Sequence, residues 1–445
     1  MKKLSLLTTL LIIGGLSTVQ AQEDLIKYSI PLTSAGNTNG ANTGVIVGEN
    51  APYQIASDNV IITHQRTTAR HLSKTVSFNL GSYKGTQIIS DAVVNNGGTS
   101  TNCLGLNGVS FIGATNEADI TISATERATP VGILDNGFTV DNATLNIQLS
   151  GKSYFTHSTT TWNVKNNGIL RYEGSNTNST HKISLNLEAG SVAELKFDGS
   201  AESHFENSTI AGQLVFKRKG VLKFYKDNLI TGQTTENATL FGGRWDLQGN
   251  GVTVTIENSE ENSVLFSYAE EAMKKLIMRN STLTLNSSNA IGLKDSKNNI
   301  YGQENISLEI GQYEGTPSTA ELILGADNSL DNIYIDSNKQ SKLYITLNNN
   351  HLYLNGLSTG LIGTIYISDF QEELICIQNI DEKFLDANYE ISCIKSGSAD
   401  DNTALYWDSA TGYITAFNPT VPEPATFAVI FGALALGFVA YRKRK

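Results

Sequence analysis

Three aspartates are the residues of this 445-residue chain whose spacing first suggests chemistry. Asp327, Asp331 and Asp336 lie within ten positions of one another in a segment rich in Asn and Ser. Paired carboxylates can act as the acid and base of a glycosidase, and carboxylate oxygens also bind Ca²⁺. Asp and Asn are abundant at every other turn of this chain as well, so the pattern favours solvated turn residues.

The histidines add no catalytic or metal-binding pattern. The six histidines stand at positions 64, 71, 157, 181, 204 and 351, without the close spacing of a zinc motif. Neither a nucleophile elbow nor a phosphate-binding loop is present in the sequence. We therefore interpret each histidine as a surface residue and expect no catalytic residue, no metal site and no cofactor.

Cysteine is sparse. The chain has only Cys103, Cys376 and Cys393, too few for a fold built on disulfides. Cys376 and Cys393 both lie in strand-like segments and could form a disulfide between neighbouring strands, or remain two buried free thiols. Cys103 has no ordered His and carboxylate partners in the sequence, so we expect a small core residue rather than a nucleophile.

Short segments of alternating polarity dominate the body of the chain. Period-two alternation over four to nine residues is typical of strands with one buried face. The clearest examples span 139–147, 182–187, 251–256, 281–285 and 342–347. Helical patterns are scarce, and only 267–278, with Glu270 and Glu271 one turn before Lys274 and Lys275, predicts a short helix.

A loose repeat favours a solenoid. Asn-Ala-Thr-Leu at 142 and 237 and Asn-Ser-Thr at 207 and 280 each place a turn-forming Asn ahead of an apolar strand position. Their irregular spacing fits coils with loops of varying length, with Asn and Thr stacked at corners and on outer faces. We therefore predict an all-β fold, a right-handed parallel β-helix, with a β-sandwich or tandem sandwiches as the alternative. The Asn- and Thr-rich body also resembles, in composition, autotransporter-like β-helix passengers.

Changes in texture suggest three parts of the body. We expect residues 22–130 to form an irregular β region that caps one end of the stack, because an open solenoid end exposes core side chains and strand edges. The β-helix itself would span 131–360. A C-terminal β unit at 361–417 would close the other end, with Leu405–Trp407 and Tyr413–Phe417 as its last strands.

The N-terminal segment has the pattern of a secretory signal peptide. Lys2 and Lys3 precede an apolar core, and small residues before Gln22 predict cleavage between Ala21 and Gln22, which assigns 1–21 to the leader. Without 1–21 and 421–445, the chain keeps 26 of its 32 basic and 42 of its 43 acidic residues, a net charge of −16. This acidic balance argues against binding to nucleic acid or, by charge, to anionic lipid.

The C-terminal segment predicts a membrane span. Residues 425–441 carry no charge, and as a helix these 17 residues would reach about 25 Å, enough for a thin bilayer. The cationic block of Arg442, Lys443, Arg444 and Lys445 should keep the end of the span cytoplasmic and place the preceding body outside. Pro422 and Pro424 keep the residues before them extended, so Glu423 would lie in an accessible strand just outside the membrane.

Together, Val421, Pro422, Glu423 and Pro424, the apolar span and the basic cluster resemble the PEP-CTERM sorting signal. Only 421–445 carries the resemblance. It implies an exosortase-like membrane enzyme that cleaves near the Pro-Glu-Pro triplet, and bacteria that make extracellular polysaccharide. The other expected partners are signal peptidase, the membrane and extracellular polysaccharide.

The expected function follows from this order of segments. We expect a non-enzymatic structural or adhesive protein of a bacterial cell envelope, anchored as a precursor and then released to the surface or matrix. The alternative is a polysaccharide lyase, glycoside hydrolase or glycan-binding protein on the same β-helix.

Overall fold

The computed structural model describes most of the body of the chain and little of its two ends. The residues described are 29–32, 45–46, 53–64, 70–72, 76–90, 104–124, 131–133, 135–152, 154–155, 159–175, 181–198, 203–216, 221–233, 239–241, 244–258, 264–267, 275–294, 306–335, 340–357, 363–417, 432–434 and 436. The chain divides into two compact units, Met1–Ala201 and Glu202–Lys445.

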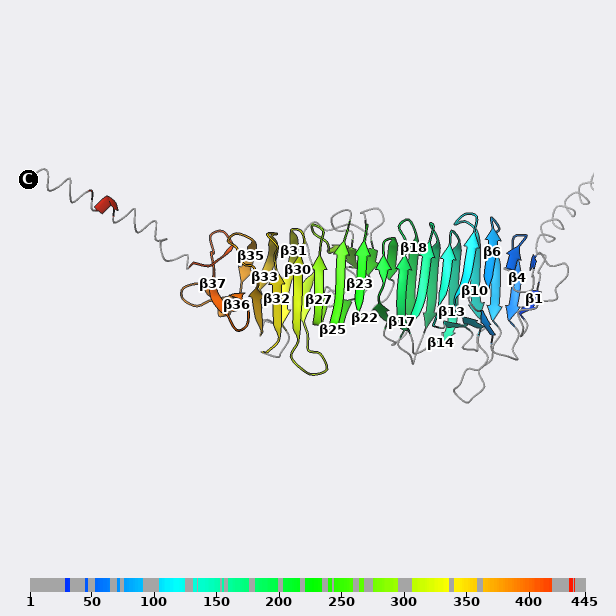
Figure 1. The fold of residues 1–445 in the computed structure, drawn as a ribbon, viewed down its shortest axis with the longest axis horizontal. Helices are drawn as coiled ribbons and strands as arrows, with labels where there is room; N and C mark the ends of the chain where they lie inside the picture. Colours follow the sequence, from blue (N-terminus) through cyan, green and yellow to red (C-terminus); the bar gives the residue numbers. More distant parts are fainter. Residues whose placement is uncertain are drawn as a thin grey trace, which may run out of the picture. The chain divides into compact units, whose positions relative to one another are not determined.

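The first unit is built from short strands, several of which lie side by side in Figure 1. They are β1 (Ser29–Leu32), β2 (Val45–Ile46), β3 (Tyr53–Ile55), β4 (Ile61–His64), β5 (Arg70–Leu72), β6 (Ser77–Gly81), β7 (Thr86–Ser90), β8 (Leu104–Leu106), β9 (Val109–Gly113), β10 (Asp119–Ala124), β11 (Val131–Ile133), β12 (Phe138–Asp141), β13 (Thr144–Lys152), β14 (Tyr154–Phe155), β15 (Thr160–Lys165), β16 (Ile169–Ser175), β17 (His181–Leu187) and β18 (Val192–Asp198).

These strands wind into a β-solenoid with three parallel ladders. One ladder runs β1-β4-β7-β10-β13-β16-β18, a second β5-β8-β11-β14, and a third β3-β6-β9-β12-β15-β17. In the first ladder Asp119 pairs with Thr144, Thr144 with Ile169 and Ile169 with Val192, so successive partners lie 25, 25 and 23 residues further along the chain. Each coil of the solenoid therefore uses about the same length of chain.

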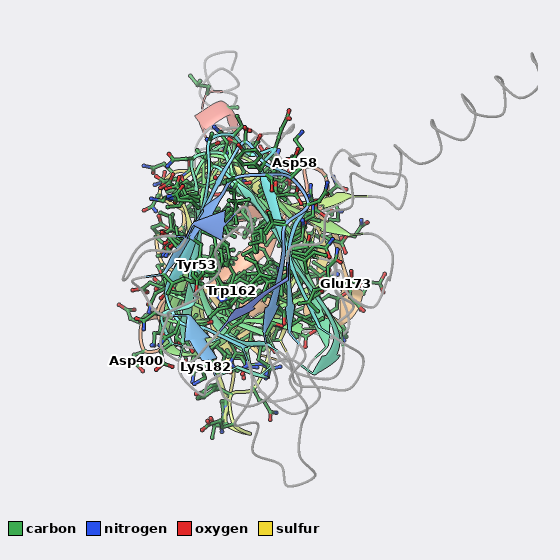
Figure 2. The ribbon with its side chains drawn as sticks, turned by 90° about the vertical axis from the view of Figure 1, so that its right-hand side faces the viewer. Tyr53, Asp58, Trp162, Glu173, Lys182 and Asp400 are labelled. Atoms are coloured by element: carbon green, nitrogen blue, oxygen red, sulfur yellow. The ribbon has the colours of Figure 1, made fainter. Side chains whose placement is uncertain are left out.

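The core of this unit consists of columns of apolar side chains that run through the coils. In the first ladder Ile122, Ile147 and Tyr172 occupy the same register position, and all three are at most 1% exposed. Trp162 on β15 points into the interior, whereas Glu173 lies on the outside (Figure 2). Alternation along each strand thus sends one set of side chains to the core and the other to water.

Polar side chains stack on the outer face, as the sequence predicted. Asn163 Nδ2 donates to Thr139 Oγ1 at 3.4 Å, and Asn186 Nδ2 donates to Asn163 Oδ1 at 2.9 Å. These three residues are register partners on β12, β15 and β17. The coils are therefore linked by side-chain bonds in addition to the backbone ladders.

The corners depend on residues that tolerate a left-handed backbone. Asn142, Asn167 and Gly190 stand 25 and 23 residues apart and have φ of 47°, 62° and 79°. Non-glycine residues other than Asn and Asp rarely adopt this conformation. Asn207 and Asn280, two more of the Asn positions singled out in the sequence, both have φ of 49°. The predicted turn-forming role is confirmed for these positions, while Asn237 lies outside the described residues.

Replacing Asn142 tests the importance of a corner. An alanine there has to adopt φ near 47° and loses the bond from Asn142 Nδ2 to the Ala114 carbonyl at 2.8 Å. We expect Asn142→Ala to lower the free energy of unfolding by about 1–2 kcal/mol. Asn142→Gly keeps the conformation and should lose less. Urea unfolding followed by circular dichroism measures both, and equal losses would contradict the argument from backbone strain.

The second unit continues with the same kind of strand. They are β19 (Ser203–Glu206), β20 (Thr209–Ile210), β21 (Gln213–Phe216), β22 (Val221–Tyr225), β23 (Asp227–Thr231), β24 (Thr239–Phe241), β25 (Arg244–Glu257), β26 (Val264–Ser267), β27 (Lys275–Leu285), β28 (Gly292–Lys294), β29 (Ser307–Ile310), β30 (Thr319–Leu324), β31 (Asn328–Ile335), β32 (Lys342–Thr346), β33 (Leu352–Leu357), β34 (Thr364–Ile367), β35 (Ile375–Ile380), β36 (Glu390–Gly397), β37 (Asn402–Trp407) and β38 (Ile414–Thr415). A single 3₁₀ turn, η2 (Glu382–Phe384), is found among the described residues of this unit.

Parallel ladders again form the second unit until its C-terminal end. One ladder runs β25-β27-β29-β31-β33-β35, and β27-β30-β32-β34-β36 forms another. Asn328 pairs with Leu352 and Leu352 with Ile375, which are 24 and 23 residues apart. After β36 the pairing becomes antiparallel, through β37 and β38. The last strands predicted from Leu405–Trp407 and Tyr413–Phe417 are therefore confirmed.

The structure settles two of the expectations for the fold. The described ladders are almost all parallel, whereas the sandwiches considered as an alternative pack antiparallel sheets, so the β-solenoid holds and the sandwich is wrong. The helix predicted at 267–278 is also wrong where it can be compared, because Ser267 ends β26 and Lys275 begins β27. Leu276 and Met278 are buried in a ladder there, and tertiary pairing outweighs the local charge pattern.

The proposed division into parts remains a prediction. The described strands between Tyr53 and Ala124 already lie in the same parallel ladders as β11 to β13, within the region expected to form an irregular cap. Between 361 and 417 the ladders first continue through β34 and β35, and the antiparallel strands follow.

Candidate functional site

The aspartates that drew attention in the sequence lie at β31 in the second unit. Asp327 directly precedes this strand, and Asp331 lies within it. Asp336 is outside the described residues. β31 pairs in parallel with β33, and β33 with β35. We use the name "β33 face" for the outward-facing Asp327, Ser329, Asp331, His351, Tyr353, Asn355 and Cys376 on these strands.

Asp327 holds the beginning of β33. Its Oδ1 accepts the backbone N–H of His351 at 2.7 Å and lies 3.2 Å from Nδ1 of the same residue. Both side chains remain open to water, with 52% and 37% of their surfaces exposed. An ion pair this exposed contributes little to stability, so the backbone bond that fixes the corner is the more important of the two.

Asp331 has a different set of partners. It accepts from Ser307 Oγ at 3.1 Å and from Asn355 Nδ2 at 3.1 Å, and Asn379 Nδ2 donates to the Asn355 carbonyl at 3.2 Å. Four residues of extended strand separate Asp331 from Asp327, a distance of roughly 13 Å. Glycosidase carboxyl groups stand about 5–9.5 Å apart, so these two aspartates do not form such a pair. They serve instead as hydrogen-bond acceptors between coils.

Tyr353 is the side chain of the β33 face that the sequence reasoning missed. It is 41% exposed, one of the few large side chains in the described residues with such exposure. Its register partners are Ser329 on β31 and Cys376 on β35, both smaller than a ring. The ring centre lies 5.9 Å from that of His351, at an interplanar angle of 12°. Partial burial, with Tyr413 and Asp327 adding to it, raises the pKa of the Tyr353 phenol.

The polarity pattern contained a signal for Tyr353. In the segment Leu352-Tyr353-Leu354, the two leucines are buried and the tyrosine faces outward. Aromatic residues on an outer face usually stack with neighbours in the next coil, as Tyr344 and Tyr366 do at 5.2 Å. An outward tyrosine without such a partner in register could have been found once the coil length was known.

The disulfide left open by the sequence is not formed. Cys376 and Cys393 are both free thiols, the first half-buried and the second buried. Their strands do not pair with each other, since β35 pairs with β33 while β36 pairs with β34 and β37. Cys103 lies outside the described residues. Burial raises the pKa of Cys376, and it raises the pKa of Cys393 to about 12.

The two thiols should therefore differ in reactivity with iodoacetamide. With a pKa of about 12 in the folded protein, Cys393 carries almost no thiolate at pH 8, and it regains an ordinary thiol pKa only when the chain unfolds. We expect peptide masses after labelling at pH 8 to show Cys376 modified before Cys393, and both modified in urea without reductant. Rapid labelling of Cys393 in native buffer, or protection of both in urea, would contradict this assignment.

The histidines are only partly surface residues. His351 is half-exposed, but His204 is 7% exposed and its ring lies 4.5 Å from that of Tyr225, so the surface assignment was wrong for His204. His157 lies outside the described residues, as do the side chains of the other three. No group of three or more His, Cys, Asp or Glu in the described part of the chain is arranged to hold a metal ion.

The residues expected to direct export all lie outside the described residues. They are Ala21, Gln22, Val421, Pro422, Glu423, Pro424, Arg442, Lys443, Arg444 and Lys445. Within the span predicted at 425–441, residues 432–434 and 436 are described, and they are helical. Among the residues that the structure describes, no helix has the length and apolar character required to cross a membrane.

Comparison with protein-family models, with curated proteins and with solved structures found no match to this chain.

Proposed function

We propose that the chain is an exported bacterial cell-envelope protein, delivered through the PEP-CTERM-like segment 421–445 and processed by an exosortase-like enzyme. The observation that carries the proposal is the order of three features: the Pro-Glu-Pro triplet, the 17 uncharged residues and the Arg-Lys-Arg-Lys cluster. Each has a physical role, respectively an extended recognition strand, a membrane helix at 425–441 and a block that stays cytoplasmic.

The β-solenoid body supports a structural or adhesive role. Its outer face in the first unit carries exposed ion pairs between coils, such as Lys196 Nζ to Glu173 Oε1 at 2.5 Å and Arg171 Nε to Glu194 Oε1 at 3.4 Å. Such pairs add little to stability but keep a long repetitive surface hydrated. With its apolar columns inside, this body fits a soluble scaffold outside the cell.

The proposal includes the finer features of the fold. We assign a right-handed winding to the solenoid, because parallel crossovers are right-handed in about 98% of cases. Signal peptidase would remove 1–21, and the released body would reside at the surface or in the extracellular matrix, in contact with polysaccharide.

Protease added to intact cells tests the exported orientation. We expect the body, detected by an antibody against residues 131–360, to be degraded, while a cytoplasmic marker protein survives. Protection of the body in intact cells and its degradation only after lysis would reject the proposal.

A further inference from the structure

The β33 face contains an aromatic ring that its own coil neighbours leave uncovered. In register with Tyr353 stand Ser329 and Cys376, which are too small to cover the ring. In other columns of this protein, rings stack on rings, for example Tyr53 on Phe78 at 4.7 Å. Tyr353 instead retains 41% of its surface, beside the nearly parallel ring of His351.

Hydrogen-bonding groups border this ring on the same face. Asp327 is bound through Oδ1 to His351, and within the described part of the chain the structure gives no hydrogen bond to its Oδ2. Ser329 Oγ donates to Asn289 Oδ1 at 2.8 Å, which leaves its oxygen able to accept. Asn355 is held by its bond to Asp331. Donors and acceptors are thus fixed around one open ring.

We propose that the β33 face binds the pyranose rings of a neutral polysaccharide. The face of an aromatic ring is electron-rich, and the axial C–H groups of a pyranose carry a slight positive charge, so the sugar packs flat on Tyr353. The hydroxyls of the sugar then bond to Asp327, Ser329 and His351. The surrounding groups also select by charge, because Asp327 and Asp331 repel the carboxylates of a uronate polymer.

This inference gives a ligand class to the adhesive role and rests on the proposed export, which brings the face into contact with extracellular glycans. The binding itself is a property of the purified chain and does not depend on sorting. The two can therefore fail separately.

The test uses the full chain, purified in detergent, and neutral hexasaccharides of glucose, mannose, galactose and xylose, with hexagalacturonate as the charged comparison. Isothermal titration should detect binding of at least one neutral sugar and weaker or no binding of the uronate. Tyr353→Ser should weaken the neutral complex by roughly tenfold or more, and Tyr353→Phe should retain it.

Tyr389 provides the matched control, because it is 37% exposed and lies outside the β33 face. Tyr389→Ser should bind as the unmodified chain does, and all three variants should show the same circular dichroism spectrum. The proposal is overturned if no neutral sugar binds, if the uronate binds more tightly, or if Tyr353→Ser and Tyr389→Ser have equal effects.

Discussion

Replacing Pro422, Glu423 and Pro424 together with alanine is expected to trap the protein in the membrane as an unprocessed precursor. Without the two prolines, the helix predicted at 425–441 can extend upstream, since alanine favours helix and neither the missing donors nor the ring clash remains. The recognition strand and its carboxylate are then lost together. In the native host we expect nearly all of the variant in the membrane fraction, at the mass of the chain without its signal peptide.

Pro419→Ala serves as the matched control for this experiment. It also removes a proline upstream of the span but leaves the triplet intact. The control should be processed as the unmodified chain is, and fractionation followed by intact mass measures both variants. Normal processing and surface display of the triple variant would refute the role assigned to the triplet.

Trp162→Ala is expected to cause the largest loss of stability in the first unit, about 3–5 kcal/mol. The indole is fully buried, and its ring contacts Phe138 at 5.0 Å and Tyr172 at 5.5 Å. Its Nε1 donates to Thr160 Oγ1 at 3.1 Å, so its polar atom is also paired. Truncation leaves a cavity between coils that the surrounding ladders cannot easily close.

Urea unfolding, followed by circular dichroism, measures this loss. Glu173→Ala is the control on the outer face, because its only described ion pair is exposed, and it should change stability by less than about 0.5 kcal/mol. Since each coil contacts mainly its neighbours, the first unit could unfold before the rest, and a separate early transition in Trp162→Ala would agree with this view. Equal effects of the two substitutions would contradict the assigned core.

Much of the fold could be predicted from alternation alone. The segments at 182–187, 251–256, 281–285 and 342–347 all lie in strands of the solenoid, because period-two patterning records which face is buried. The coil length was missed because the search followed Asn followed by Ala or Ser and Thr. The corner at Asn142 recurs as Asn167 and then as Gly190, since either residue type permits positive φ.

Other features depend on which coils become neighbours, and local sequence does not record this. The charge pairs near Lys274 and Lys275 suggested a helix, but burial of Leu276 and Met278 between ladders decides for a strand. Asp327 and Asp331 seemed a pair by spacing, yet along an extended strand they are too far apart to act together. Tyr353 became notable only when the register placed Ser329 and Cys376 beside it.

The mass of the C-terminal peptide of the mature protein, isolated from its native host, tests the central proposal most directly. We predict that the mature protein ends near the Pro-Glu-Pro triplet, without the apolar span and the basic cluster, and with any added group visible as extra mass. A mature protein that still ends in Arg442-Lys443-Arg444-Lys445 would contradict the proposal.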